Sequence, residues 1–172
     1  MQGCNKFCTY CIVPYVRGRE ISRTIDDISN EIQTLADEGY KEVTLLGQNV
    51  NSYGLDFRNG TDFGDLIRAI DKIDDIERVR YMTSHPRDMT FEMIDAMAES
   101  SKVVRHMHLP VQHGSNEMLK KMNRGYTIEH FKELLSYVRS KMPDIVVTTD
   151  LITGFPGETE EMHQETLALL KE

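Results

Sequence analysis

From residue 24 onward the sequence alternates segments of helical periodicity with short apolar segments rich in β-branched residues. Apolar residues three and four apart predict amphipathic helices, and short apolar runs between polar or glycine-containing segments predict buried strands. The predicted helices are 24–39, 62–73, 90–99, 115–122, 127–142 and 159–172. The predicted strands are 43–46, 79–83, 103–109 and 145–152. No other feature restricts the possible folds as strongly.

This regular alternation predicts an α/β fold with a parallel sheet and right-handed crossovers. Four strands are too few to close an eight-stranded barrel, so we expect an open, curved, partial β/α barrel of the TIM-like type. A flat, doubly wound sheet is the alternative, because periodicity does not separate the two. In both architectures the chemistry lies at the carboxyl ends of the strands.

Polar residues follow each predicted strand, which makes these positions candidates for one shared cleft. They are Gly47, Gln48 and Asn49 after the first strand, Ser84 and His85 after the second, His108, Gln112 and His113 after the third, and Asp150 at the fourth. Buried polar groups with partners inside the protein are common, so this pattern alone assigns none of them a ligand.

The length and composition fit one soluble domain. The chain has 172 residues, of which 40% are hydrophobic and 28% charged, as in an ordinary folded domain. No apolar run approaches the roughly 18 residues that a membrane span requires, and the first residues do not resemble a signal peptide. We therefore expect a cytoplasmic protein without a membrane partner.

The formal net charge of −8 argues against a passive nucleic-acid-binding domain with a broad basic surface. The beginning of the chain is nevertheless basic, with a single acidic residue against Lys6, Arg17, Arg19 and Arg23. If this chain contacts a polyanion, we expect the contact at this end.

All the cysteines lie close together, at positions Cys4, Cys8 and Cys11. An odd number of clustered thiols in a cytosolic chain indicates a metal site rather than a disulfide framework. Thiolates bind zinc and iron–sulfur clusters, but a structural zinc site requires a fourth protein ligand. Three cysteines on a four-iron cluster leave one iron open to an outside ligand. A small zinc or redox module without catalysis stays an alternative at this point.

The cysteine segment reads CNKFCTYC and precedes repeated β/α units, and in both respects it resembles the radical SAM enzymes. The resemblance implies that Cys4, Cys8 and Cys11 bind three irons of a 4Fe–4S cluster, while S-adenosylmethionine (SAM) chelates the fourth iron. It also implies that one electron from the cluster cleaves SAM to a 5′-deoxyadenosyl radical, which abstracts hydrogen.

Longer segments are similar to the methylthiotransferase branch of these enzymes. They are GCNKFCTYCIVPYVRGRE at 3–20, LLGQNVNSYG at 45–54, TSHP at 83–86, HLPVQ at 108–112, MNRGY at 122–126 and GFPGET at 154–159. The second segment resembles the branch that acts on N(6)-dimethylallyladenosine beside the tRNA anticodon. This resemblance implies sulfur insertion at the adenine 2-position, then methylation. The alternatives are methylthiotransferases of threonylcarbamoyladenosine in tRNA or of a ribosomal protein.

The same resemblance implies that 1–172 is a radical SAM core with a domain on each side of it. A preceding domain would hold a second cluster that supplies or carries the sulfur, and an RNA-binding TRAM domain would follow. We therefore expect a barrel truncated at both ends and a fragment that does not complete methylthiolation alone. The implied partners are tRNA and an electron donor such as a flavodoxin or ferredoxin.

The resemblance also suggests which side chains contact the cofactor and the substrate. The expected cofactor contacts are Tyr10, Gly47, Gln48, Asn49, Ser84, His108, Gln112 and Asp150, and the expected substrate contacts are Arg17 and Arg19. Many radical SAM enzymes have Gly-Gly-Glu where Gly47, Gln48 and Asn49 stand. Amide oxygens can still accept hydrogen bonds from the SAM ammonium group, but without the negative charge. His113 stands where this family is expected to have a serine, and the sequence suggests no role for it.

Overall fold

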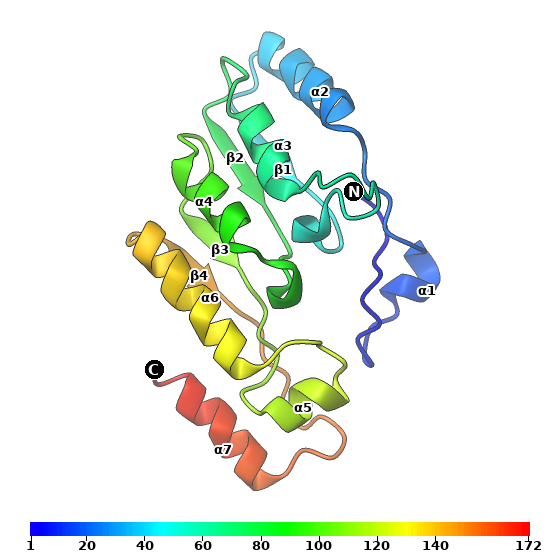
Figure 1. The fold of residues 1–172 in the computed structure, drawn as a ribbon, viewed down its shortest axis with the longest axis vertical. Coiled ribbons are helices and arrows are strands. Elements are labelled where there is room, and N and C mark those ends of the chain that lie inside the picture. Colours follow the sequence, from blue (N-terminus) through cyan, green and yellow to red (C-terminus); the bar gives the residue numbers. More distant parts are fainter.

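The computed structural model describes residues 1–172 as an α/β fold in which most helices lie on one face of the strands, while the short helix Val13–Arg17 stands apart (Figure 1). The strands are β1 (Glu42–Leu45), β2 (Arg78–Tyr81), β3 (His106–His108) and β4 (Val146–Thr148). β1 pairs with β2 and β3 pairs with β4, both in parallel. A parallel bridge between Val79 and Val103 connects the two pairs. The strands thus follow one another in chain order as an open array.

The helices alternate with the strands as the periodicity predicts. They are α1 (Val13–Arg17), α2 (Ile25–Asp37), α3 (Phe63–Ile70), α4 (Phe91–Glu99), α5 (Asn116–Lys121), α6 (Ile128–Lys141) and α7 (Glu160–Leu169), with 3-10 turns η1 (Val50–Ser52) and η2 (Pro86–Asp88). Hydroxyl and carboxylate side chains fix several helix starts, because each accepts a hydrogen bond from a backbone N–H of the first turn. These caps are Thr24, Asp62, Thr90, Thr127 and Thr159.

The hydrophobic core lies between the helices and the strands. It includes fully buried residues from α3, α4 and β3, among them Phe63, Ile70, Ile94, Met97 and Met107. Methionine fills irregular gaps well because its side chain is unbranched and flexible. The core therefore holds the carboxyl ends of the strands in fixed positions. No helix has the length and apolar character that crossing a membrane requires.

Two predicted strands are longer in the sequence pattern than in the structure. The predicted strand 145–152 is regular only over Val146–Thr148, and the predicted strand 103–109 only over His106–His108. A strand lasts only as long as a neighbour pairs with it, and a sequence pattern does not show where pairing stops. Helix α1 follows the cysteine segment and has no counterpart among the predicted elements.

Candidate cluster-binding site

The cysteine loop, which we define as residues 4–11, extends from a short antiparallel pairing near the N-terminus. Gln2 and Ile21 exchange two backbone hydrogen bonds of 3.0 and 2.8 Å, and the amide of Cys4 donates to the Gly18 carbonyl at 3.1 Å. These contacts bring the two ends of the segment together, so the loop and α1 form its distal part (Figure 1). The Cys4 and Cys8 side chains are buried, Cys11 is half-buried, and all three thiols are free.

The loop is docked on the segment that follows α5. The amide of Thr9 donates to the Met122 carbonyl at 3.2 Å, and Asn123 Nδ2 donates to the Phe7 carbonyl at 2.8 Å. On the other side, the amide of Gly3 donates to Gln48 Oε1 at 2.8 Å. Gln48, an expected cofactor contact, therefore holds the start of the loop against the carboxyl end of β1.

Arg124 contacts the loop from the same segment, and the sequence reasoning assigned it no role. Its Nη1 donates to Cys8 Sγ at 3.5 Å and to the Tyr10 hydroxyl at 3.2 Å, and its Nη2 donates to the Pro110 carbonyl at 2.9 Å. Arg124 is buried. A buried guanidinium requires partners for its charge and its donors, and a thiolate at Cys8 would supply the charge. The sequence signal for it was its place in the segment MNRGY at 122–126, which is similar to the methylthiotransferases.

Tyr10 closes one side of the loop. Its ring packs edge-on against Phe155, with the centroids 6.3 Å apart. Burial raises the pKa of Tyr10 to about 12, despite the nearby charge of Arg124, so the phenol keeps its proton at neutral pH. The structure thus brings Tyr10, Cys8 and the glycine-containing turn around Phe155 to one place.

Two expected cofactor contacts have buried polar atoms without a partner. These atoms are Asn49 Oδ1 and Ser84 Oγ. Asn49 is partly engaged, since its Nδ2 donates to Asp88 Oδ2 at 2.8 Å and to the Ser52 hydroxyl. Unpartnered buried polar atoms are rare in folded proteins and indicate a ligand, an ion or ordered water. Both atoms follow a strand, at the edge where the cysteine loop docks.

His85 provides a third unpartnered atom at this edge. Burial, assisted by the nearby charge of Arg124, lowers the pKa of His85 to about 3, so its ring is neutral. Nδ1 accepts a hydrogen bond from the Arg87 amide at 3.2 Å, which leaves the proton on Nε2. Nε2 is therefore a buried donor without an acceptor.

The expected contacts on β3 and β4 lie together. His108 Nδ1 is 3.0 Å from Thr148 Oγ1, and His108 Nε2 is 3.2 Å from Asp150 Oδ2. The amide of Gln112 donates to the Asp150 carbonyl at 2.9 Å, and Gln112 has a positive φ of 72°. The Ser84 amide donates to the His108 carbonyl, so the expected residues of three strands are connected.

Arg17 and Arg19 are not part of this group. Both are exposed, at the end of α1 and just after it, and neither forms an ion pair. The guanidinium of Arg19 lies over the Phe7 ring, 5.8 Å from its centroid. Phe7 in turn packs edge-on against Tyr15. Gly47, an expected cofactor contact, lies against the N-terminal residue: a Cβ at this position would be 2.7 Å from Met1 Cγ.

His113 has a structural partner that the sequence did not reveal. It is fully buried, its Nε2 donates to Glu158 Oε1 at 3.0 Å, and its Nδ1 accepts from the Ser115 amide at 3.0 Å. The second oxygen of Glu158 accepts from the Phe155 amide at 3.2 Å. His113 therefore fixes the turn that carries Phe155, which contacts Tyr10.

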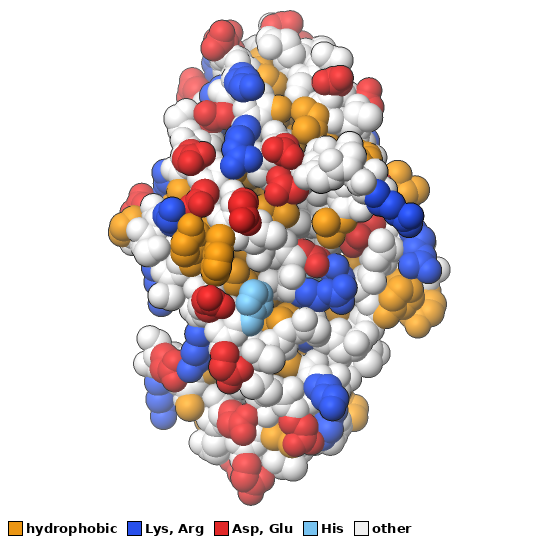
Figure 2. Space-filling view, in the orientation of Figure 1, with side chains coloured by type: hydrophobic (Ala, Val, Ile, Leu, Met, Phe, Trp, Pro, Cys, Tyr) orange, Lys and Arg blue, Asp and Glu red, His pale blue; other side chains and the backbone are white.

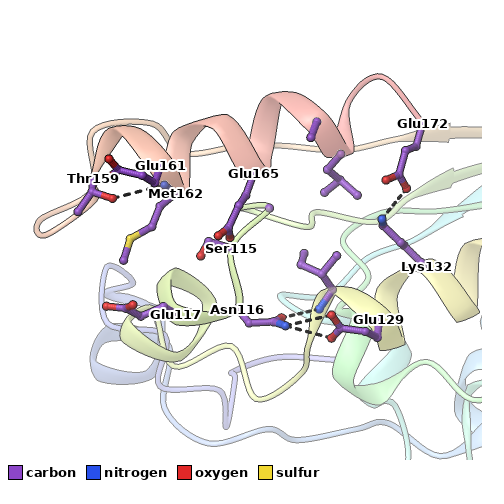
Figure 3. Close-up of a pocket in the computed structure, with 14 residues that line it drawn as sticks. Ser115, Asn116, Glu117, Glu129, Lys132, Thr159, Glu161, Met162, Glu165 and Glu172 are labelled. Atoms are coloured by element: carbon purple, nitrogen blue, oxygen red, sulfur yellow. Dashed lines mark hydrogen bonds and ion pairs between the residues drawn. The ribbon is translucent and has the colours of Figure 1, made fainter.

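A separate cavity lies away from the cysteine loop. It has a volume of about 660 Å³ between α5, α6 and α7, and five glutamates are among the residues that line it (Figure 3). Lys132 pairs with Glu172 and neutralises that carboxylate, and Asn116 donates hydrogen bonds to both oxygens of Glu129. No residue of the cysteine loop lines it.

The donor set fits an iron–sulfur cluster bound by three thiolates. Three free cysteines meet the ligand requirement, and iron–sulfur clusters are held by cysteine thiolates. No group of three His, Cys, Asp or Glu side chains is placed to hold a single metal ion. A cluster does not require the three thiolates to converge on one ion, because each thiolate bonds a different iron. The buried atoms Asn49 Oδ1, Ser84 Oγ and His85 Nε2 have no partner within the protein.

Sequence comparisons identify the family. The model of the "Radical SAM superfamily" matches residues 1–170. The tRNA-2-methylthio-N(6)-dimethylallyladenosine synthase of Desulforamulus reducens is 61% identical over 172 residues, and that of Pelotomaculum thermopropionicum is 58% identical over 172 residues. Each match covers 100% of this chain and 38% of the relative. The chain thus spans less than half the length of these curated relatives.

Two solved structures share the fold. The methyltransferase TsrM from Kitasatospora setae, solved with cobalamin and a 4Fe–4S cluster bound, matches with a TM-score of 0.77 at 20% identity. The enzyme OxsB, with aqua-cobalamin and SAM bound, matches with a TM-score of 0.75 at 18% identity. The matches cover 99% of this chain, and 33% and 25% of those chains. At these identities the likeness concerns the fold alone.

Proposed function

Because the chain belongs to the radical SAM superfamily, whose cofactors are a 4Fe–4S cluster and SAM, we propose that it is the core of a tRNA methylthiotransferase. The reaction is methylthiolation of the adenine 2-position in N(6)-dimethylallyladenosine next to the anticodon, in the cytoplasm. The names of the relatives that match the whole chain support this substrate. Since those relatives are much longer, we expect residues 1–172 not to complete the reaction alone.

The single observation that carries the proposal is the trio of free thiols in a loop docked at the carboxyl edge of the strands. Cys4, Cys8 and Cys11 would hold the cluster and leave one iron for SAM. When bound, the cluster supplies the electron that cleaves SAM to a 5′-deoxyadenosyl radical. Arg124 Nη1 donates a hydrogen bond to Cys8 Sγ, which orients this ligand. Tyr10 accepts a hydrogen bond from Arg124 and packs on Phe155, which holds the last turn of the loop.

We assign the SAM contacts to the polar residues at the strand ends. Ser84 and Asn49 offer buried oxygen atoms without partners, which suit the ammonium and hydroxyl groups of SAM. Gln48, His108, Gln112 and Asp150 belong to the same proposed set, with Gly47 and Tyr10. Part of this set is already engaged within the protein, since Gln48 accepts from the Gly3 amide. Their roles then include positioning as well as contact.

For the RNA we propose the surface formed by Phe7, Tyr15, Arg17 and Arg19. In Figure 2, basic and hydrophobic side chains gather at the right edge, over α1. Tyr15 is 74% exposed, and exposed aromatic rings next to arginine suit an unpaired base beside phosphates. The remaining affinity would come from a TRAM domain, the sulfur from a second cluster in a preceding domain, and the electron from a flavodoxin or ferredoxin.

The test of the core function uses the purified chain under anaerobic conditions. After reconstitution with iron and sulfide we expect about four irons per chain, an electron paramagnetic resonance signal after reduction, and a change in that signal when SAM is added. SAM cleavage should release 5′-deoxyadenosine. Replacing Cys4, Cys8 or Cys11 with serine should abolish these results, whereas the exposed substitution Ser140→Ala should not.

Failure to take up a cluster, or SAM cleavage that survives any of the serine substitutions, would contradict the core function. Testing the proposed substrate requires a protein with the full length of the relatives. That protein should form the methylthio product on tRNA containing N(6)-dimethylallyladenosine. If the methylthio product forms instead on threonylcarbamoyladenosine tRNA or on a ribosomal protein, the proposed substrate is wrong, but the proposed cofactor chemistry still holds.

A further inference from the structure

Lys6 lies inside the cysteine loop, between the first two cysteines, yet its side chain is buried. Its Nζ lies 2.7 Å from Asp88 Oδ1 and 2.6 Å from Asp88 Oδ2, and the two side chains are 7% and 9% exposed. A lysine in a surface loop normally keeps its ammonium group in water. Because the Lys6 ammonium group is buried and contacts both oxygens of Asp88, the loop is attached to the protein interior.

Asp88 belongs to η2 and ties a third segment to this pair. Its Oδ2 accepts from Ser52 Oγ at 2.6 Å and from Asn49 Nδ2 at 2.8 Å. Burial opposes ionisation, but the hydrogen bonds from Lys6 and Ser52 outweigh it and hold the pKa of Asp88 below its usual value. One carboxylate thus connects the cysteine loop, the segment after β1 and the segment after β2.

The position of Lys6 is coupled directly to a ligand sulfur. The Lys6 amide donates to Cys4 Sγ at 3.4 Å, so a displacement of Lys6 moves a donor that orients this thiol. The neighbouring Asn5 is held separately by Glu20, whose two oxygens accept from the Asn5 amide and from Asn5 Nδ2, both at 3.1 Å. The residues between Cys4 and Cys8 are therefore fixed by the protein alone.

A buried ion pair of this kind adds little net stability but fixes geometry strongly. Desolvation of the two charges offsets much of their attraction, whereas removal of one partner leaves the other charge buried without compensation. Such pairs are therefore better explained by the position that they enforce than by stability. Here the enforced position is that of the cysteine loop.

We propose that Asp88 is a positioning residue that, through Lys6, holds the cysteine loop in its ligating arrangement before any cluster binds. The inference rests on the proposed function for its purpose, but it concerns the cluster-free protein. Asp88 does not contact the cluster or SAM in this role; it acts on Cys4 and Cys8 through the loop between them. A loop prepared in this way binds its cluster without first having to become ordered.

The experiment compares Asp88→Asn, Lys6→Met and the double variant in the cluster-free chain. Two readouts report on the loop: hydrogen exchange at the Cys4 and Thr9 amides, and the rate at which an aromatic disulfide reagent modifies the thiols. We expect each single variant to exchange and react about ten-fold faster than the wild type or more. The double variant should be no worse than either single variant, because both act through one pair.

A control variant removes an Asp–Lys pair of the same chemistry at an exposed site elsewhere. Asp95 accepts from Lys141 Nζ at 2.7 Å on the surface of α4 and α6, so Asp95→Asn makes the same chemical change far from the loop. It should leave loop exchange and thiol reactivity at wild-type values. Exchange at the Val79 amide, which donates to the Lys102 carbonyl, should be unchanged in every folded variant and separates local loosening from global unfolding.

The proposal would be overturned if amide hydrogen exchange in the loop and the rate of thiol modification were equal to wild type in Asp88→Asn and in the charge-free double variant. It would also be overturned if the effects of the two single variants were additive in the double variant. These results do not depend on the cluster, so they are distinct from a failure of the proposed function. After reconstitution, the variants should also bind less iron than the Asp95→Asn control.

Discussion

Gly3→Ala would test whether the cysteine loop depends on a backbone contact that leaves no room for a side chain. Gly3 has a positive φ of 77°, and a Cβ at this position would lie 2.0 Å from the carbonyl oxygen of Arg19 and 2.8 Å from that of Gly18. Neither obstacle is a flexible side chain. The two paired backbone segments at the base of the loop would therefore have to separate.

The matched control is Gly18→Ala in the same pairing. Gly18 has φ 73° and ψ −161°, a region almost restricted to glycine, and a Cβ there meets nothing within 4 Å. Both alanines therefore carry a conformational strain of about 1–3 kcal/mol. Only Gly3→Ala adds the cost of crowding, about 1–3 kcal/mol for overpacking. That extra cost corresponds to roughly a 5- to 150-fold larger opening equilibrium.

Native-state hydrogen exchange measures this opening locally. The amides of Cys4 and Ile21 donate across the pairing, to Gly18 and Gln2, so they exchange when the base of the loop opens. Their protection should fall by a further 5- to 150-fold in Gly3→Ala relative to Gly18→Ala. Equal protection in the two variants would refute the reasoning, because it would mean that the close approach at Gly3 costs nothing.

Three further predictions concern the rest of the fold. Burial opposes ionisation of Glu158, but hydrogen bonds from His113 and from backbone amides outweigh it and lower its pKa below 4.5. The ionised form therefore stabilises the protein above that pH, so Glu158→Gln should lower the free energy of unfolding at pH 7. The deficit should shrink as the pH falls below 4.5, and a pH-independent deficit in urea titrations would contradict this. Ile94→Ala, in the core, should cost about 2–5 kcal/mol, and a loss under 1 kcal/mol would mean that Ile94 is not tightly packed. Gly114→Ala places a Cβ 2.5 Å from the Thr166 Cα, so overpacking should cost about 1–3 kcal/mol in thermal unfolding; unchanged stability would show that α7 moves freely.

The sequence predicted the parts of the site that depend on neighbours along the chain. The spacing of Cys4, Cys8 and Cys11 indicated a thiolate-bound centre, because a short loop brings nearby thiols together. The alternation of helices and strands predicted an α/β fold with parallel strands, which the structure confirms. It also placed Ser84 and His108 at strand ends; His108 is the last residue of β3, and Ser84 lies just beyond the end of β2. Their roles toward SAM stay predictions.

The contacts that connect distant parts of the chain were outside the reach of such patterns. Arg124 meets Cys8 across 116 positions, and Lys6 meets Asp88 across 82. His113 had no assigned role until the fold placed it against Glu158. No local spacing encodes these pairs, since they form only when separate β/α units pack side by side.

The sequence by itself therefore determined the class of the fold and predicted the chemistry of the ligands. Both follow from short-range geometry: thiols a few residues apart and apolar residues at fixed periods. The tertiary structure alone decided which charged side chains are buried against the cysteine loop and where each strand stops. The physical reason is that burial and strand pairing depend on what packs nearby in space, and that neighbour is set by the whole chain.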